Sequence, residues 1–194
     1  MSTNSFYSFE ELRSIGFRSI GRDVRISRKC SIYAPENVSI GDHVRIDDFC
    51  LLTGSIEIGS FVHISAYVGM FGMHGIAVGD FANISIRTTI LSATDDFSGE
   101  HMTGSPVLPD GYAKTECGKV TLEKHSIVGA YCLVFPNLIV SEGTAVAAMS
   151  LVTKSTEPWT MYRGIPARPF KQRSRNVLDL EKRLLGTEKG QGGS

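Results

Sequence analysis

The sequence lacks the features that would direct a protein to nucleic acid, to a membrane or to secretion. Lysine plus arginine and aspartate plus glutamate number 20 each, so no net charge favours nucleic acid or an anionic membrane as the main partner. No apolar run approaches the ~20 residues that a membrane span needs. Met1 to Tyr7 is polar and lacks the basic and apolar regions of a signal peptide. We therefore expect a cytoplasmic protein without membrane insertion.

Cysteine is sparse, and nucleotide and metal motifs are missing. The four cysteines show no CxxC pair or zinc-like spacing, so we expect reduced and mostly buried thiols. No Walker loop or dinucleotide fingerprint is present, so side chains and strand backbone would have to hold any phosphate. The five histidines lack the converging spacing of a γ-carbonic-anhydrase-type enzyme, and we expect no metal.

What the sequence does contain is an aliphatic residue at every sixth position. Neither an α-helix nor a lone strand produces a period of six. A repeated unit of one short strand and one turn does. The pattern is typical of a parallel β-helix with three hexads per coil and inward aliphatic side chains, here with roughly six coils. The phase of the six-residue repeat shifts by two residues at two places, between Val38 and Ile40 and between Ile76 and Val78. The series comprises Ile20, Ile26, Ile32 and Val38; Ile40, Ile46, Leu52, Ile58, Ile64, Met70 and Ile76; Val78, Ile84 and Ile90; and Leu122, Val128, Val134, Val140, Val146 and Val152.

The repeat also sets the boundaries of the chain's parts. We expect an N-terminal helical cap over residues 1–19, with a capping box at Ser8 to Glu11 and a helix ending near Gly16. The β-helix follows over residues 20–170. A C-terminal helix over residues 171–186, closed by Gly186, should lie against the last coil because solenoid ends need caps. Residues 187–194 should form a disordered tail.

The period disappears over residues 95–119. Glycine and proline in this segment predict a loop without an element of its own. Its length of about 25 residues exceeds that of usual structureless connections. It is either an insertion tolerated at a coil corner or a functional segment, and we favour function because binding residues concentrate on loops held by rigid scaffolds. Asp95, Asp96 and His101 are its candidate residues.

Two further regions could contribute to a site. His63 precedes the inward Ile64, so its side chain should point outward, and His74 lies in the nearby glycine-rich surface that a ligand or another backbone could approach. His125 should be at the surface of a coil corner. Near the C-terminus, four basic residues form either a solvated face or a clamp for a phosphate-bearing ligand: Arg163, Arg168, Lys171 and Arg173.

The hexads, the loop and the terminal "VTK…GIPAR" resemble the left-handed β-helix acyltransferases that use acetyl-CoA, from about Ile20 to Arg173. Within that superfamily, "FYSFEELRSIGF", "VRIDDFC", "HISAY", "DDFSG" and "AAMSLVTK" are similar to the dTDP-4-amino-4,6-dideoxyglucose N-acetyltransferases of O-antigen (lipopolysaccharide) biosynthesis. The resemblance implies an all-β fold built on a left-handed parallel β-helix. It also implies acetyl-CoA as co-substrate, a nucleotide-linked sugar as acceptor, and a homotrimer with active sites between adjacent subunits.

The resemblance places the co-substrate on the C-terminal coils. Matched to galactoside and maltose acetyltransferases, Ala130 and Ala148 occupy equivalent faces of successive coils and meet the pantetheine arm together with Thr153 and Lys154. Arg168 and Lys171 fall where the relatives place basic residues near the nucleotide phosphates.

The chain departs from those relatives at the general base. They carry a His-Pro where this chain has Asp96, whereas His63 lies near the position of their active-site asparagine. We therefore expect a redistributed base, in which His63 takes the proton and Asp96 orients it or binds the sugar amine. The expected substrate-binding residues are Asp95, Tyr67, Gly72, His74, Asn83 and His101.

The implied chemistry is direct attack of a sugar amine on a thioester. A protonated amine is no nucleophile, and a histidine with a reference pKa of ~6.5 can accept its proton at neutral pH. An amine is also a better nucleophile than a hydroxyl and needs a weaker base. The absence of the usual catalytic histidine therefore favours N-acetylation, and O-acetylation of a saccharide hydroxyl stays an alternative. The long loop and the basic C-terminal end disfavour a third reading, a non-catalytic β-helical binding module.

Overall fold

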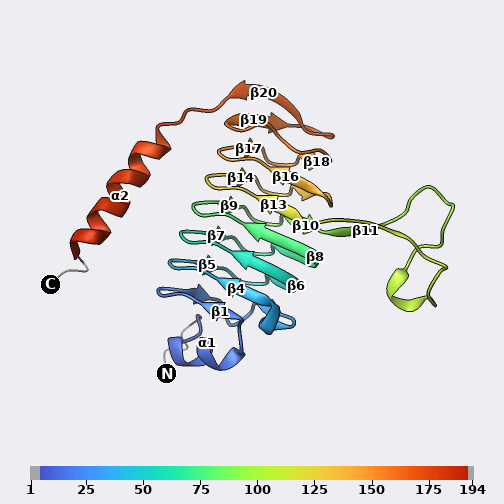
Figure 1. The fold of residues 1–194 in the computed structure, drawn as a ribbon, viewed down its shortest axis with the longest axis horizontal. Helices are drawn as coiled ribbons and strands as arrows, with labels where there is room; N and C mark the ends of the chain where they lie inside the picture. Colours follow the sequence, from blue (N-terminus) through green and yellow to red (C-terminus); the bar gives the residue numbers. More distant parts are fainter. Residues whose placement is uncertain (1–4, 192–194) are drawn as a thin grey trace.

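The hexads wind into a parallel β-helix, as the period predicts. The computed structural model describes residues 5–191, except for the side chains of residues 105 and 188–191. Figure 1 shows the coils stacked in chain order, from the N-terminal helix upward. Seven parallel strands lie along one face of the stack, so there are about seven coils rather than the roughly six expected.

Each coil contributes short strands to three faces. The first face contains β2 (Arg25–Ile26), β5 (Arg45–Ile46), β7 (His63–Ile64), β9 (Asn83–Ile84), β14 (Ile127–Val128), β17 (Ala145–Val146) and β19 (Thr160–Arg163). The second contains β3 (Ser31–Ile32), β10 (Thr89–Leu91), β15 (Leu133–Val134) and β18 (Leu151–Val152). The third contains β1 (Ser19–Ile20), β4 (Val38–Ile40), β13 (Val120–Leu122) and β16 (Leu138–Val140). β6 (Leu51–Ile58) and β8 (Gly69–Val78) bend around the corner between the second and third faces and belong to both.

The aliphatic hexads fill the axis of the stack. Ile46, Ile64 and Val128 are completely buried, and full burial of such a side chain contributes about 1.5–3 kcal/mol. The two phase shifts arise because third-face strands carry two inward residues, as Val38 and Ile40 do in β4. A coil can therefore lengthen by two residues while its neighbours stay in register.

One edge of the stack, between the third and first faces, carries a column of rings. Its residues take left-handed backbone, with φ of 55° at His43, 58° at Phe61, 59° at Phe81 and 58° at His125. This conformation costs an L-residue about 1–2 kcal/mol. The rings stack with centroids 4.7 to 5.2 Å apart, which offsets part of that cost. His125 is buried in this column, so the expectation that it lies at the surface is wrong.

The N-terminal helix α1 (Phe9–Ile15) forms as the capping box predicts. Ser8 Oγ accepts the Glu11 N–H at 3.3 Å, and Glu11 Oε2 accepts the Ser8 N–H at 2.6 Å. Gly16 ends the helix in the left-handed conformation, with φ of 91°. A 3₁₀ turn, η1 (Pro35–Asn37), follows in the first coil.

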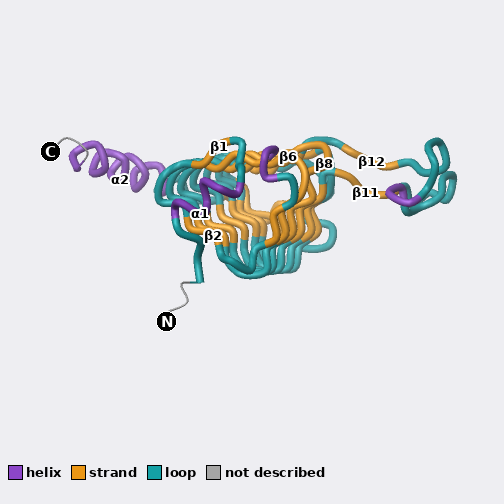
Figure 2. Tube along the Cα trace, turned by 90° about the horizontal axis from the view of Figure 1, so that it is seen from below, coloured by secondary structure: helices purple, strands orange, loops and turns teal. Residues whose placement is uncertain are grey.

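The segment predicted to be a loop is in part a hairpin. β11 (Ala93–Asp95) pairs antiparallel with β12 (Thr115–Cys117), and a 3₁₀ turn, η2 (Ser105–Val107), lies between them. Figures 1 and 2 both show the hairpin projecting from the corner between the second and third faces. The stack continues beneath it, because β9 pairs directly with β14 and β10 with β15.

The C-terminal helix differs from its prediction in extent and in position. α2 (Val177–Gln191) begins later than residue 171 and runs through Gly186, which does not take the left-handed conformation that would end it. Residues 187–191 are therefore helical rather than disordered, and residues 192–194 of the predicted tail lie outside the described part. The last coil is closed by β20 (Arg168–Gln172), antiparallel to β19, while α2 projects to the side opposite the hairpin (Figure 2). Neither described helix is long and apolar enough to cross a membrane.

Candidate active site

The outward side chains of the first face form one row across the coils. The strand register aligns Arg25, Arg45, His63, Asn83, Ile127, Ala145 and Met161. The first four members are polar and the last three are apolar. The face is thereby divided between β9 and β14 into a polar half and an apolar half.

His63 lies within the polar half, pointing outward as predicted. Its side chain is 41% exposed, and its Nε2 lies 2.8 Å from Asp47 Oδ2. The register places the side chain between Arg45 and Asn83. The predicted substrate-binding residue Asn83 is thus an immediate neighbour of the predicted base.

Asp47, which was not among the predicted candidates, contacts His63 directly. Its second carboxylate oxygen accepts Arg45 Nε–H at 2.7 Å. Burial alone would raise the pKa of Asp47, but the hydrogen bonds from His63 and Arg45 lower it below its usual value. A signal was available, because one coil is 18 residues and the "VRIDD" stretch therefore lies beside "VHIS".

Asp96, the other predicted catalytic residue, belongs to a separate network in the hairpin, directly after β11. Its carboxylate accepts the Ser98 N–H and the Ser98 hydroxyl, both at 2.8 Å, and lies 2.9 Å from His101 Nδ1. The backbone hydrogen bond from Ser98, followed by the contact with His101, lowers the pKa of Asp96 to about 2. The structure thus brings together Asp96 and His101, which were predicted separately.

Asp95 lies at a cleft where the hairpin leaves the coils. The cleft has a volume of about 630 Å³ and is open beside Phe71, Met73 and Pro106. Asp95 Oδ2 accepts the Gly104 N–H at 3.1 Å. A carboxylate at the rim of an apolar cleft is suited to binding a cationic or hydrogen-bonding group of a ligand.

The glycine-rich surface is only partly open. His74 lines a hollow of about 380 Å³ together with Lys119. Gly72 is buried, and a Cβ there would lie 2.7 Å from the Ser55 carbonyl oxygen. Of the two predicted uses of this glycine, close approach of another backbone is the one that the geometry fits.

One chain does not bring His63 and Asp96 together. His63 lies on the first face, whereas Asp96 follows β11 beyond the corner between the other two faces. Both Figure 1 and Figure 2 show the hairpin extending away from the stack at that corner. Tyr67 lies on a different edge, stacked on Phe49 at 4.9 Å and covered by the Arg87 guanidinium at 4.8 Å.

The predicted co-substrate residues gather near the C-terminal coils. Ala130 and Ala148 lie on stacked coils, since the Ala130 carbonyl accepts the Met149 N–H at 2.8 Å. A cleft of about 420 Å³ brings together Thr153, Lys154 and Arg168. Lys171 lies in β20, opposite Met161. An ammonium and a guanidinium at one cleft can bind phosphate.

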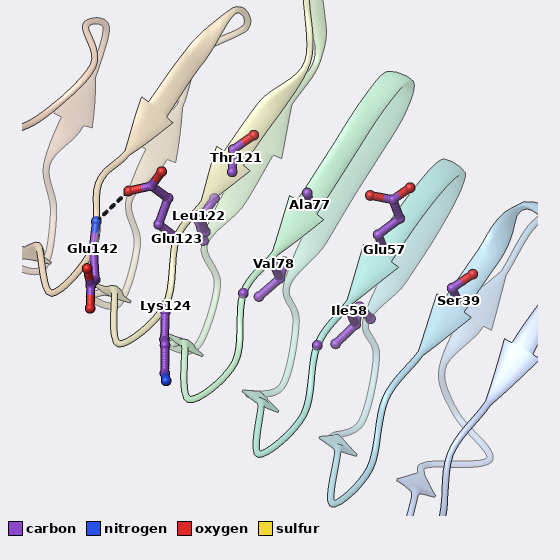
Figure 3. A pocket seen from close by; sticks show the side chains of 12 residues that line it. Ser39, Glu57, Ile58, Ala77, Val78, Thr121, Leu122, Glu123, Lys124 and Glu142 are labelled. Carbon is purple, nitrogen blue, oxygen red and sulfur yellow. Dashed lines mark hydrogen bonds between the residues drawn. The ribbon is translucent and has the colours of Figure 1, made fainter. Parts of the chain in front are cut away.

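Another hollow, of about 640 Å³, crosses the third face away from these residues (Figure 3). Glu57, Glu123, Lys124 and Glu142 line it, and Glu123 Oε2 accepts the Glu142 N–H at 2.8 Å. None of the predicted site residues reaches it. Among the side chains that the structure describes, no three from His, Cys, Asp or Glu converge as a metal site would require.

Comparison with known proteins identifies the family. No protein-family model matches the chain. It is 41% identical over 174 residues to dTDP-4-amino-4,6-dideoxy-D-glucose acyltransferase of Escherichia coli, a match that covers 88% of this chain and 90% of that protein.

Among solved structures, the chain is 49% identical to AntD, an N-acyltransferase from Bacillus cereus. The structure of AntD with dTDP and 3-hydroxybutyryl-CoA matches with a TM-score of 0.94 over 96% of this chain and 100% of that one. The structure of an AntD variant with dTDP-4-amino-4,6-dideoxyglucose and coenzyme A matches with a TM-score of 0.93, over 95% of this chain and 99% of that one. The chain therefore belongs to the family of dTDP-4-amino-4,6-dideoxy-D-glucose acyltransferases.

Proposed function

We propose that this protein transfers an acetyl group from acetyl-CoA to the 4-amino group of a dTDP-linked 4-amino-4,6-dideoxy sugar. The relatives supply the reaction class, since AntD binds dTDP, the amino sugar and coenzyme A. The observation on this chain that carries the proposal is the division of the first-face row into polar and apolar halves. A sugar fits beside Arg45, His63 and Asn83, and a pantetheine arm fits along the apolar half.

Acetyl-CoA would extend from that boundary toward the C-terminal coils. The small Ala130 and Ala148 leave room for the pantetheine arm along the stacked coils. Thr153, Lys154 and Arg168 would contact the nucleotide end at their shared cleft, with Lys171 beside them in β20. Charge-assisted hydrogen bonds from these side chains would hold its phosphates in the absence of a phosphate-binding loop.

The reaction requires one new bond and one proton acceptor. The amine nitrogen attacks the thioester carbonyl carbon, the C–N bond forms, and the C–S bond breaks to release coenzyme A as the thiol. His63 accepts a proton from the attacking nitrogen and returns it to the departing sulfur, a role that contributes about 10²–10⁴ in rate. The Asn83 amide beside it can donate a hydrogen bond to the developing oxyanion.

We further propose that the active site is shared between subunits of a homotrimer. His63 and Asp96 lie on different sides of one chain, so both can serve one site only if Asp96 comes from a neighbouring copy. The projecting hairpin would then carry Asp95, Asp96 and His101 to the neighbour's first face. The pathway would be the cytoplasmic synthesis of a surface polysaccharide such as O-antigen.

A thiol-release assay tests the function. Acetyl-CoA is combined with dTDP-4-amino-4,6-dideoxyglucose or with its 4-hydroxy analogue, and 3-hydroxybutyryl-CoA replaces acetyl-CoA in a parallel series. We expect turnover with the amine and little with the hydroxyl, because the unprotonated amine is the better nucleophile. Absence of turnover with every pair, together with absence of coenzyme A binding by calorimetry, would reject an acyltransferase.

A further inference from the structure

We propose that Asp47 positions His63 for proton transfer, an inference that rests on the proposed function and deepens it. Asp47 follows β5 directly, so the end of that strand fixes its backbone beside β7. Its carboxylate joins two neighbours: Oδ2 lies 2.8 Å from His63 Nε2, and Oδ1 accepts Arg45 Nε–H at 2.7 Å. The side chain of Asp47 is half as exposed as that of His63, 20% against 41%.

This arrangement determines which nitrogen of His63 can act. An ionised carboxylate only accepts hydrogen bonds, so the neutral imidazole must carry its hydrogen on Nε2. Nδ1 is then the basic nitrogen, and within residues 5–191 it has no hydrogen-bond partner. The more exposed His63 thus offers its basic atom to a ligand while Asp47 holds the other side of the ring.

The charges around the ring support positioning over a chance surface pair. Arg45 on one neighbouring strand holds the second oxygen of Asp47, and Asn83 on the other strand is uncharged. Isolated surface ion pairs contribute little to stability, but this carboxylate is fixed by two donors. The adjacent Asp48 contacts Ser27 and Lys29 instead of His63, so it provides a matched control.

The test compares Asp47→Asn, Asp47→Glu and Asp48→Asn with His63→Asn. An asparagine amide can donate to Nε2 and favour the wrong tautomer, so we expect Asp47→Asn to lower kcat about 100-fold with KM values within about twofold of wild type. Asp47→Glu should keep more activity than Asp47→Asn because it retains the carboxylate. Asp48→Asn should behave as wild type. Nitrogen-15 NMR of the histidine rings should show the Nε2–H tautomer of His63 in wild type and its loss in Asp47→Asn.

The outcomes separate this inference from the proposed function. If Asp47→Asn keeps kcat within about twofold while His63→Asn loses activity, the positioning role is wrong and acyl transfer stands. An unchanged His63 tautomer in Asp47→Asn would also overturn the role. If wild type transfers no acyl group, the proposed function fails with it. Circular dichroism of each variant excludes misfolding as the cause of a lost rate.

Discussion

Gly143 shows how a single residue sets the end of the ring column. It takes a left-handed backbone, with φ of 66°, at the corner where preceding coils place Phe81 and His125. The space that its side chain would fill is occupied by the Trp159 indole, which covers the end of the column 6.2 Å from His125. A glycine is required here by close approach as well as by conformation.

Gly143→Ala should therefore destabilise the protein more than the backbone conformation alone explains. A Cβ at this position would overlap the indole, and overpacking adds about 1–3 kcal/mol to the conformational cost. Gly111→Ala is the control, because Gly111 also has a left-handed φ, 89°, with no atom near its Cβ direction. Urea unfolding of both variants measures the difference. Equal losses would show that Trp159 moves aside without cost.

At the scale of elements, the hairpin is separable from the coils. β11 and β12 pair with each other while the coils close beneath them through β9 with β14 and β10 with β15. The stack thus depends little on what the hairpin carries. The candidate residues Asp96 and His101 lie on the part of the segment beyond the paired strands.

Replacing residues 96–114 by Asn-Gly should remove activity and spare the fold. The two-residue turn suits the antiparallel Asp95–Thr115 pair that remains. We expect the free energy of unfolding to change by less than about 1 kcal/mol, whereas acyl transfer should fall at least as far as in Asp96→Asn. Urea unfolding and the thiol assay provide the two measurements. Retained transfer would remove the hairpin from the site.

Helix α2 contacts the coils through the carboxylate of Glu181. Glu181 accepts hydrogen bonds from Lys124 Nζ at 2.5 Å and from His125 Nε2 at 2.7 Å, while Leu180 and Leu184 stay exposed. Burial would raise the pKa of Glu181, but these two partners lower it below its usual value. A lowered pKa means that the attachment is complete above the usual value of about 4.3 and is lost as pH falls below it.

Glu181→Gln should release α2 at neutral pH. The neutral amide loses the ion pair with Lys124, so we expect hydrogen exchange over residues 177–187 to accelerate to the rate that wild type reaches in acid, after correction for intrinsic rates. The coils should be unaffected by Glu181→Gln at neutral pH. Unchanged protection of α2 would show that other contacts hold the helix.

Elements built from the repeat could be predicted, and those built from distant contacts could not. The inward hexads and the Ser8 capping box are local patterns, and both are confirmed. The hairpin strands have three residues each and pair across a long segment, so they leave no period. The seventh coil was missed because Tyr162 takes the inward position there, sixteen residues after Val146.

The candidate site divides in the same way. The outward direction of His63 follows from its place before Ile64, and the structure agrees. Its contact with Asp47 joins two consecutive coils. The period of six does not show which residues of neighbouring coils lie side by side, because that also depends on the number of residues in each coil. The burial of His125 likewise depends on Phe81, Trp159 and Glu181, which come from three separate segments.

At the scale of the whole molecule, the separation of His63 from Asp96 makes subunit sharing testable. His63→Asn and Asp96→Asn subunits are each expected to be nearly inactive alone. Mixed trimers from co-expression would contain sites with His63 from one copy and Asp96 from the next, restoring about a quarter of wild-type activity if subunits mix at random. A site within one chain would give no recovery in mixed trimers.

Trp159 is the single tryptophan of the chain, and it lies at one end of the stack. It is 4% exposed and lies beneath the Arg175 guanidinium, 5.5 Å from its ring centre. Its emission therefore reports on the last coil and the start of the C-terminal arm, whereas far-ultraviolet circular dichroism averages over every coil. In a one-dimensional stack the ends can open before the middle. The protein thus carries its own fluorescent label for fraying: emission that shifts before the dichroism changes would locate the first opening at this end.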